Sequence, residues 1–315
     1  MVPQFFSALR TAIPAAFWVA CLSNSAVQAA EIIVFRSWAG NQLKEQDVIA
    51  ELHLPAVLAN RLPVIITQHG STQDKPFKSG KGKTDVYSQQ IIDKGLAQGF
   101  AVVAIDAFYP RNTQGTEKEQ FPAAQFYALT LRNLLAADSR FDPERIFYTG
   151  FSYGGQMVIE TLMPLAGPYR NSRWRAIASA EGNCQIQPKA RAEAPPSIFV
   201  LGELSHYPPK PCIYLSEQLK QAGNVSQHVT ISGANHYYSL SGVRDVVANS
   251  RTLNACTDNP VIRENHQLAR HLDGTPTDLA KAFQTCSGNR SHTRGNEEKL
   301  GEATDHVIRF FTQYK

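Results

Sequence analysis

The chain has 315 residues and a formal net charge of +4 at pH 7, from 31 basic and 27 acidic side chains. This charge is mild and dispersed and forms no basic stripe, so the composition does not imply binding to nucleic acid. Beyond the first 22 residues, no segment of the sequence is apolar enough to predict a membrane span.

The N-terminal segment has the pattern of a secretory signal peptide. Residues 1–10 carry one positive side chain and no acid, and the apolar run Thr11–Leu22 is too short to cross a bilayer comfortably. Small residues at Val27 and Ala29 predict cleavage before Ala30, which makes residues 1–29 the signal peptide. We therefore expect a periplasmic or secreted protein. A lipoprotein acylated at Cys21 is the less favoured alternative.

From Glu31 onward, the sequence alternates short β-forming runs with helical patterns. Such alternation predicts an α/β fold with a mostly parallel central sheet and helices on both faces. The first two strands are expected to be antiparallel near a sheet edge. The predicted strands are Ile32–Trp38, Val48–Leu54, Leu62–Thr67, Phe100–Ile105, Arg145–Thr149, Trp174–Ala180, Ser197–Leu201 and Ser226–Ile231; the predicted helices are Asp85–Gln98, Ala123–Ala137, Gln156–Met163, Cys212–Ala222 and Glu302–Tyr314.

Residues 30–315 are long enough for one α/β domain, but the stretch at about 249–301 breaks the alternation. It is polar, has little periodicity and is bracketed by Cys256 and Cys286, which predicts an insertion held by a disulfide. Such an insertion either covers the site or decorates one edge of the domain.

The cysteines fit an exported protein. After removal of the signal peptide, four cysteines remain, and an even number in an oxidising compartment suggests two disulfides. Three pairings are possible; we favour Cys184–Cys212 and Cys256–Cys286, because each would close a local excursion of the chain. A zinc site is the alternative, but no clustered Cys/His spacing supports it. The sequence implies no cofactor and no metal.

The most informative motif is Gly150-Phe151-Ser152-Tyr153-Gly154, which has the form G-x-S-x-G. It lies between a predicted strand and a predicted helix, as in a nucleophile elbow, where a serine occupies a sharp turn. Glycines are needed there because side chains would clash with the neighbouring strand and helix. The alternative is a glycine-rich turn that carries an incidental serine.

Five polar residues and one glycine fall at the same kind of place in the predicted fold, at or just past the end of a strand. In parallel sheets, ligands bind outside the carboxyl ends of the strands. We therefore expect a site at this edge, built from His69, Asp106, Ser152, Glu181, Gly202 and His236.

Four further segments resemble the dienelactone hydrolase family of α/β-hydrolases over nearly all of residues 30–315. They are Val64–Gly70, Val103–Arg111, Phe141–Ile146 and the turn Gly233-Ala234-Asn235-His236. The resemblance implies an α/β-hydrolase fold and hydrolysis of esters or lactones. The sequence departs from the family in two ways: the nucleophile position holds Ser152 where the best-known members have cysteine, and Ser205 stands where the family's acid is expected.

The predicted chemistry is that of a serine nucleophile. A serine hydroxyl needs a base to take its proton, and a histidine suits this role because its pKa lies near neutrality. The superfamily order along the chain is serine, acid, histidine, which selects Ser152 as nucleophile and His236 as base. A structural role for His236 is the alternative.

The acid is approached by elimination. No aspartate lies between Ser152 and His236, and of the glutamates there only Glu181 and Glu203 follow the carboxyl end of a predicted strand. Glu181 is favoured and Glu203 is the alternative acid, with a site that lacks an acid partner as a third possibility.

The expected oxyanion hole uses backbone N–H groups. One is that of Tyr153, the residue after the nucleophile, and the other comes from the His69-Gly70-Ser71 turn, at Gly70 or Ser71. His69 itself is expected to shape that turn.

The sequence thus predicts an exported serine hydrolase that cleaves a small-molecule ester or lactone. A peptidase or other acyl transferase on the same three residues is the first alternative. A non-catalytic binding protein with the same fold is the second, favoured by the missing family acid. The substrate and the oligomeric state are not determined by the sequence.

Overall fold

The computed structural model describes residues 30–38, 45–57, 60–109, 121–240, 246–252, 260–263, 268–270, 273–278 and 287–315. The predicted signal peptide with Cys21, and the predicted pair Cys256–Cys286, lie outside the described residues.

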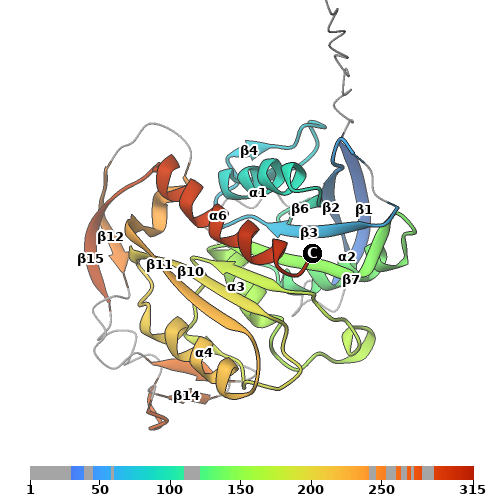
Figure 1. Cartoon of the computed structure of the whole chain (residues 1–315). Coiled ribbons are helices and arrows are strands. Elements are labelled where there is room, and N and C mark those ends of the chain that lie inside the picture. The colour runs from blue at the N-terminus through green and yellow to red at the C-terminus, as the bar shows by residue number, and fades with distance from the viewer. Residues whose placement is uncertain are drawn as a thin grey trace, which may run out of the picture.

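The described residues form a central eight-stranded sheet (Figure 1). The first two strands along the edge are antiparallel to their neighbours, as the sequence predicted for the first pair, and all other pairings are parallel. The strand order across the sheet is β1 (Glu31–Trp38), β2 (Glu45–His53), β6 (Ala101–Asp106), β3 (Leu62–Gln68), β7 (Phe141–Phe151), β8 (Ile177–Ala180), β10 (Ser197–Leu204) and β11 (Ser226–Asn235).

Helices cover both faces of this sheet, and each face has its own buried core. The helices α2 (Gln125–Ala137), α3 (Tyr153–Glu160) and α4 (Lys210–Gln221) pack on one face, and α1 (Val86–Ala97) and α6 (Glu297–Thr312) on the other. In β3, Val64 and Ile66 join the first core while Ile65 joins the second. Because both faces are buried, the central strands are continuous apolar runs.

Capping side chains fix where two helices begin. Asp85 accepts a hydrogen bond from the Ser88 N–H, so α1 starts directly after Asp85. Asn296 accepts one from the Lys299 N–H, and α6 therefore starts at Glu297, five residues earlier than predicted. The polar first turn of α6 hid this start, although acidic residues in a first turn are favoured by the helix dipole.

The stretch at about 249–301 contains short strands. The strand β12 (Val246–Thr252) pairs with β15 (Gly288–Thr293), and the two lie beyond β11 in Figure 1. The strand β13 (Val261–Arg263) pairs with β14 (Leu268–Arg270) and with β9 (Ile186–Gln187). The later part of the chain thus packs beside the end of the sheet that carries β10 and β11.

A further two-stranded ribbon, in the first part of the chain, joins β4 (Lys75–Pro76) to β5 (Lys83–Thr84).

A disulfide joins Cys184 to Cys212, and both residues are buried. Cys184 lies in the loop after β8, and Cys212 lies in the first turn of α4, which follows β10. The bond therefore ties together two segments that leave the carboxyl ends of neighbouring strands.

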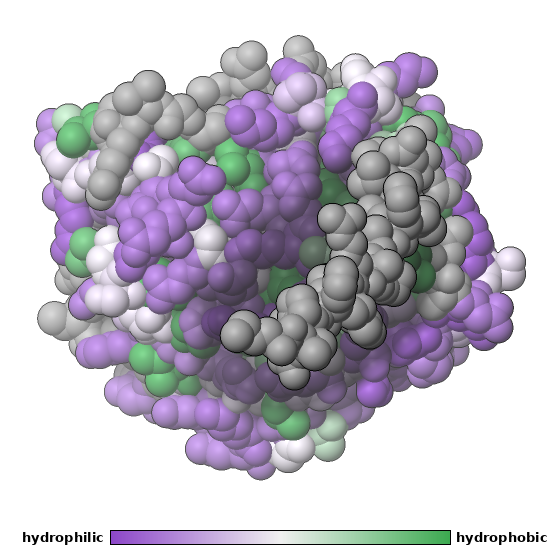
Figure 2. Space-filling view, turned by 45° about the horizontal axis from the view of Figure 1, so that its top comes forward, coloured by the Kyte–Doolittle hydropathy of each residue, from purple (hydrophilic) through white to green (hydrophobic). Residues whose placement is uncertain are grey.

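Within the described ranges, no helix has the length and apolar character of a membrane span. In the view of Figure 2, hydrophobic residues lie scattered among hydrophilic ones around a central hollow. Among the residues coloured in that view, the hydrophobic ones form no continuous apolar face.

The disulfide leads to a stability prediction. Replacing both cysteines, Cys184→Ala with Cys212→Ala, should lower the free energy of unfolding by about 3 kcal/mol, because the unfolded chain regains the freedom that the cross-link removes. Urea unfolding of the variant and the wild type measures the difference. The wild type in excess dithiothreitol is the control and should approach the variant. An unchanged unfolding midpoint in the variant would contradict the prediction.

Candidate active site

Ser152 occupies a sharp turn between β7 and α3. Its backbone has φ 53° and ψ −111°, a conformation that costs free energy for a residue with a side chain. A Cβ at Gly154 would lie 2.3 Å from the Gln68 carbonyl oxygen, and one at Gly150 would lie 2.4 Å from the Gly154 carbonyl carbon. Both glycines of the motif are therefore required by close packing, as in a nucleophile elbow.

His236 follows β11 directly and begins the short helix η3 (His236–Ser239). Asn235 holds this turn in two ways: its Oδ1 accepts from the Tyr237 N–H at 2.8 Å, and its Nδ2 donates to the Thr293 carbonyl of β15 at 2.8 Å. The imidazole is buried, and its Nε2 lies 2.8 Å from Ser152 Oγ. The structure thus brings the predicted nucleophile and the predicted base into hydrogen-bond contact.

Glu181 is the first residue after β8 and is fully buried. Its Oε2 lies 3.0 Å from His236 Nδ1, so the carboxylate can accept the Nδ1–H and leave Nε2 to accept the serine proton. Its φ of 53° is positive, as at Ser152. Among the described residues with side chains, Asn249 alone shares this property with the two.

Glu203, the alternative acid, lies elsewhere. Its side chain is fully exposed and accepts hydrogen bonds from Ser232 Oγ at 3.0 Å and from the Gly233 N–H at 2.9 Å. These two bonds lower the pKa of the Glu203 carboxyl. The side chain points toward the β11 backbone, and the geometry brings Glu181, and not Glu203, to His236.

Burial perturbs the titration of both members of the buried pair. Desolvation raises the pKa of Glu181, and hydrogen bonds from Ser205 and Gly202 oppose this rise. Desolvation also lowers the pKa of His236, with a smaller contribution from nearby His292. A histidine with a lowered pKa is neutral at pH 7, which is the form that can accept a proton.

The backbone N–H groups expected to form the oxyanion hole differ in availability. The Tyr153 N–H lies in the first turn of α3 and has no hydrogen-bond partner among the described residues. The Gly70 N–H, in contrast, donates to buried Asp85 Oδ2 at 2.7 Å, so the prediction that Gly70 contributes to the hole is wrong. The Ser71 N–H has no backbone hydrogen-bond acceptor within the described ranges and is the remaining candidate donor of this turn.

The turn that contains Gly70 packs directly against the serine. A Cβ at Gly70 would lie 3.3 Å from Ser152 Cβ, a tight contact that favours glycine at this position. His69 shapes the turn: its Nδ1 lies 2.5 Å from the Gly70 carbonyl, and its Nε2 accepts from the Ala107 N–H at 3.0 Å. The structural role expected of His69 agrees with these contacts.

Two residues at the end of β10 lie closer to the site than the sequence indicated. Ser205 Oγ donates to Glu181 Oε2 at 2.5 Å, and the His206 ring stacks on the His236 ring with centroids 3.7 Å apart. The sequence signal for Ser205 was its place where the family's acid is expected. Nothing in the sequence pattern indicated the stacking of His206.

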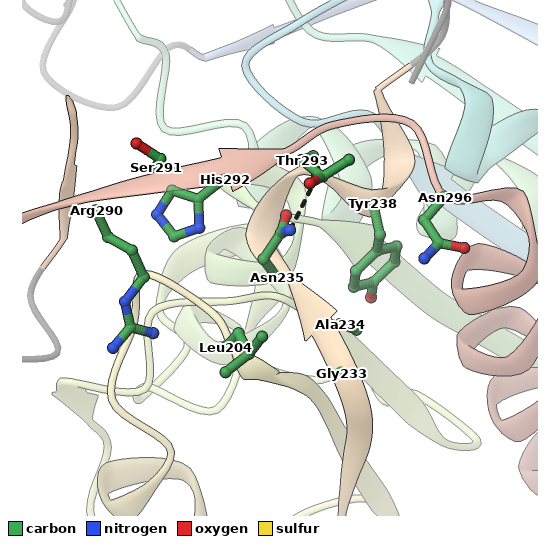
Figure 3. Close-up of a pocket in the computed structure, with 10 residues that line it drawn as sticks. All are labelled: Leu204, Gly233, Ala234, Asn235, Tyr238, Arg290, Ser291, His292, Thr293 and Asn296. Carbon is green, nitrogen blue, oxygen red and sulfur yellow. Dashed lines mark hydrogen bonds between the residues drawn. The ribbon is translucent and has the colours of Figure 1, made fainter. Parts of the chain in front are cut away.

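A cavity of about 170 Å³ lies beside the turn that carries His236 (Figure 3). Two buried polar atoms of its lining residues, Tyr238 Oη and His292 Nε2, have no hydrogen-bond partner among the described residues. A polar space of this size accommodates a few water molecules or one small group. The lining residues are Leu204, Gly233, Ala234, Asn235, Tyr238, Arg290, Ser291, His292, Thr293 and Asn296.

No protein-family model matches the sequence, and a search of curated proteins finds no match either. Solved structures do match. Esterase 2 of Thermogutta terrifontis, phosphoramylated by tabun, has a TM-score of 0.52 and 18% identity, over 70% of this chain and 89% of the esterase. The native form of the same esterase has a TM-score of 0.50 and 18% identity, over 69% and 86% of the two chains.

A structure assigned as a dienelactone hydrolase from Klebsiella pneumoniae subsp. pneumoniae has 14% identity over 67% of this chain and 92% of its own. Its TM-score is 0.46. At these identities, the likeness to esterase 2 concerns the fold alone. Together with the parallel sheet and the strand–turn–helix geometry at Ser152, it shows that the chain has the α/β-hydrolase fold.

Proposed function

We propose that the protein is a serine hydrolase that cleaves carboxylic esters or lactones, similar to the dienelactone hydrolase family. Ser152 is the nucleophile, His236 the base and Glu181 the acid. One observation carries the proposal: a continuous chain of hydrogen bonds runs from Ser152 Oγ through His236 to Glu181 Oε2, with lengths of 2.8 and 3.0 Å. This is the constellation that activates a serine in acyl transfer.

The geometry supports a two-step reaction. Ser152 Oγ attacks the ester carbonyl carbon while His236 Nε2 takes the hydroxyl proton. The resulting oxyanion accepts hydrogen bonds from the N–H groups of Tyr153 and Ser71. Collapse of this intermediate expels the alcohol, which receives the proton from His236 and leaves an acyl-serine. Water then attacks the acyl-serine carbonyl carbon while His236 Nε2 takes its proton. Collapse of this second intermediate returns the proton to Ser152 Oγ and releases the carboxylic acid.

In this reaction, Glu181 exchanges no proton with the substrate. Its carboxylate accepts the His236 Nδ1–H, which fixes the tautomer in which Nε2 can act as base. The positive charge that develops on the imidazole during attack is then next to a negative charge in a buried site, where their attraction is strong.

We also propose that the protein is exported to the periplasm or beyond the cell. The charged start, short apolar run and small residues before Ala30 support a cleavable signal peptide. The Cys184–Cys212 disulfide agrees with an oxidising compartment.

An activity-based probe tests the nucleophile. A fluorophosphonate should label the purified protein at Ser152, because an activated serine attacks phosphorus as it attacks a carbonyl. The choice of an organophosphorus reagent follows esterase 2, which was solved phosphoramylated by tabun. Peptide mapping by mass spectrometry identifies the modified residue. Ser152→Ala is the control and should not be labelled; a folded wild type that resists the probe would overturn the proposed function.

Two matched substitutions test the acid. Glu181→Gln should lower kcat for a p-nitrophenyl ester by roughly 10²- to 10⁴-fold, because an amide can no longer stabilise the charged imidazole or enforce its tautomer. Glu203→Gln removes the same charge from an exposed side chain and should change kcat by less than about twofold. Equal losses in the two variants would contradict the assignment of Glu181.

A further inference from the structure

We propose that Ser205 is a positioning residue, which holds the Glu181 carboxylate in line with His236. Its hydroxyl lies at the carboxyl end of β10, at the position where the acid is expected from the resemblance to the dienelactone hydrolase family. This inference rests on the proposed function of Ser152, His236 and Glu181, and it assigns a role to a residue outside that set.

The contact is direct and fully buried. Ser205 Oγ donates to Glu181 Oε2 at 2.5 Å, and neither side chain is accessible to solvent. The same oxygen accepts the His236 Nδ1–H at 3.0 Å, while the Gly202 N–H donates to the other oxygen, Oε1, at 2.5 Å. Three donors therefore fix the carboxylate, and Ser205 is the only side-chain hydroxyl among them.

The backbone around Ser205 sets the direction of its hydroxyl. The Ser205 N–H donates to the Gly202 carbonyl at 3.0 Å, which closes the turn at the end of β10. The Tyr207 N–H donates to Ser205 Oγ at 3.2 Å, so this oxygen is used as an acceptor from one side. The hydroxyl hydrogen remains to be donated, and Glu181 Oε2 is its acceptor.

Glu181 depends on neutral donors. In the part of the chain that the structure describes, no lysine or arginine forms an ion pair with it. The titratable side chains that interact with it electrostatically are His236, His206, Tyr207 and Tyr238. A buried carboxylate without a cation stays ionised only if hydrogen bonds compensate for lost hydration. Burial raises the pKa of Glu181, and the bond from Ser205 is the largest of the effects that lower it.

The sign of the expected pH effect follows. Removing the hydroxyl takes away a donor to the ionised form, which raises the pKa of Glu181 further. Glu181 then becomes protonated at a higher pH than in the wild type, and a protonated acid cannot stabilise the charged form of His236. Activity should therefore be lost most near and below neutral pH and should recover as the pH rises.

The experiment compares Ser205→Ala with Ser197→Ala. Ser197 is a matched control: it is also buried, lies at the opposite end of β10 and donates to Ser226 Oγ at 3.0 Å, away from His236. Steady-state hydrolysis of p-nitrophenyl acetate is measured from about pH 5 to about pH 10. Both substitutions remove one oxygen, so thermal unfolding should report folded proteins in both cases.

For Ser205→Ala we expect kcat at pH 7 to fall about 10- to 100-fold, the loss typical of a hydrogen bond to a charged group, with KM little changed. The acidic limb of its pH profile should move to higher pH. Ser197→Ala should keep the wild-type limb. A Ser205→Ala profile with an unmoved acidic limb, or an equal shift in Ser197→Ala, would overturn the proposal.

A second measurement separates this inference from the proposed function. The proton on His236 Nδ1 is observable by NMR at low field whether or not the protein turns over an ester, and its response to pH reports the state of Glu181. In Ser205→Ala, this transition should move to higher pH; an unmoved transition rejects the role of Ser205. Failure of fluorophosphonate labelling in the wild type would reject the hydrolase function independently.

Discussion

The parallel pairing of β7, β8, β10 and β11 is the constraint on which the candidate site depends. Phe151 and Val200 both pair with Ala180, and Gly202 pairs with Ile231, so the four strands end at the same edge. The ladder continues through the site residues themselves: the Ser152 N–H donates to the Ala180 carbonyl and the Glu181 N–H to the Val200 carbonyl, each at 2.9 Å. The backbones of Ser152 and Glu181 are therefore held by the sheet itself, apart from the contacts of their side chains.

The positive φ of Ser152 and of Glu181 follows from this arrangement. Each residue is the last to take part in the ladder before the chain turns away from the sheet, and each adopts φ 53°. Such a conformation costs of order 1–3 kcal/mol for a residue with a side chain. The surrounding hydrogen bonds and close packing offset that cost. The strain is thus located at the two residues whose side chains must meet His236 from opposite sides.

The electrostatics of the site follow from its burial. Without solvent, the Glu181 carboxylate relies on hydrogen-bond donors from the end of β10, and the His236 ring is covered by stacked His206. Because β10 and the residues directly after it supply both the donors and the stacking ring, Glu181 and His236 are held by one segment. The Cys184–Cys212 disulfide ties the loop after Glu181 to the helix that follows this segment.

Much of the fold could be predicted from the spacing of apolar residues in the sequence. The alternation of apolar strands and helical patterns gave the sheet and its helices to within a few residues, because strands buried on both faces leave a strong signal. The start of α6 was misjudged, since its first turn is polar and its buried residues begin at Leu300. The strands between 249 and 301 were missed because short strands with polar residues leave little pattern.

The sequence by itself was enough to predict the elbow at Ser152, the histidine turn and two glutamates as the candidate acids. These are local properties: glycine spacing, strand ends and the absence of aspartate between Ser152 and His236. Only the tertiary structure shows which of the two contacts His236: the Glu181 carboxylate does, while Glu203 binds the backbone of β11. The tertiary structure also decided that the Gly70 N–H is used by Asp85 and that Ser205 contacts the acid, since both contacts join residues far apart in the sequence.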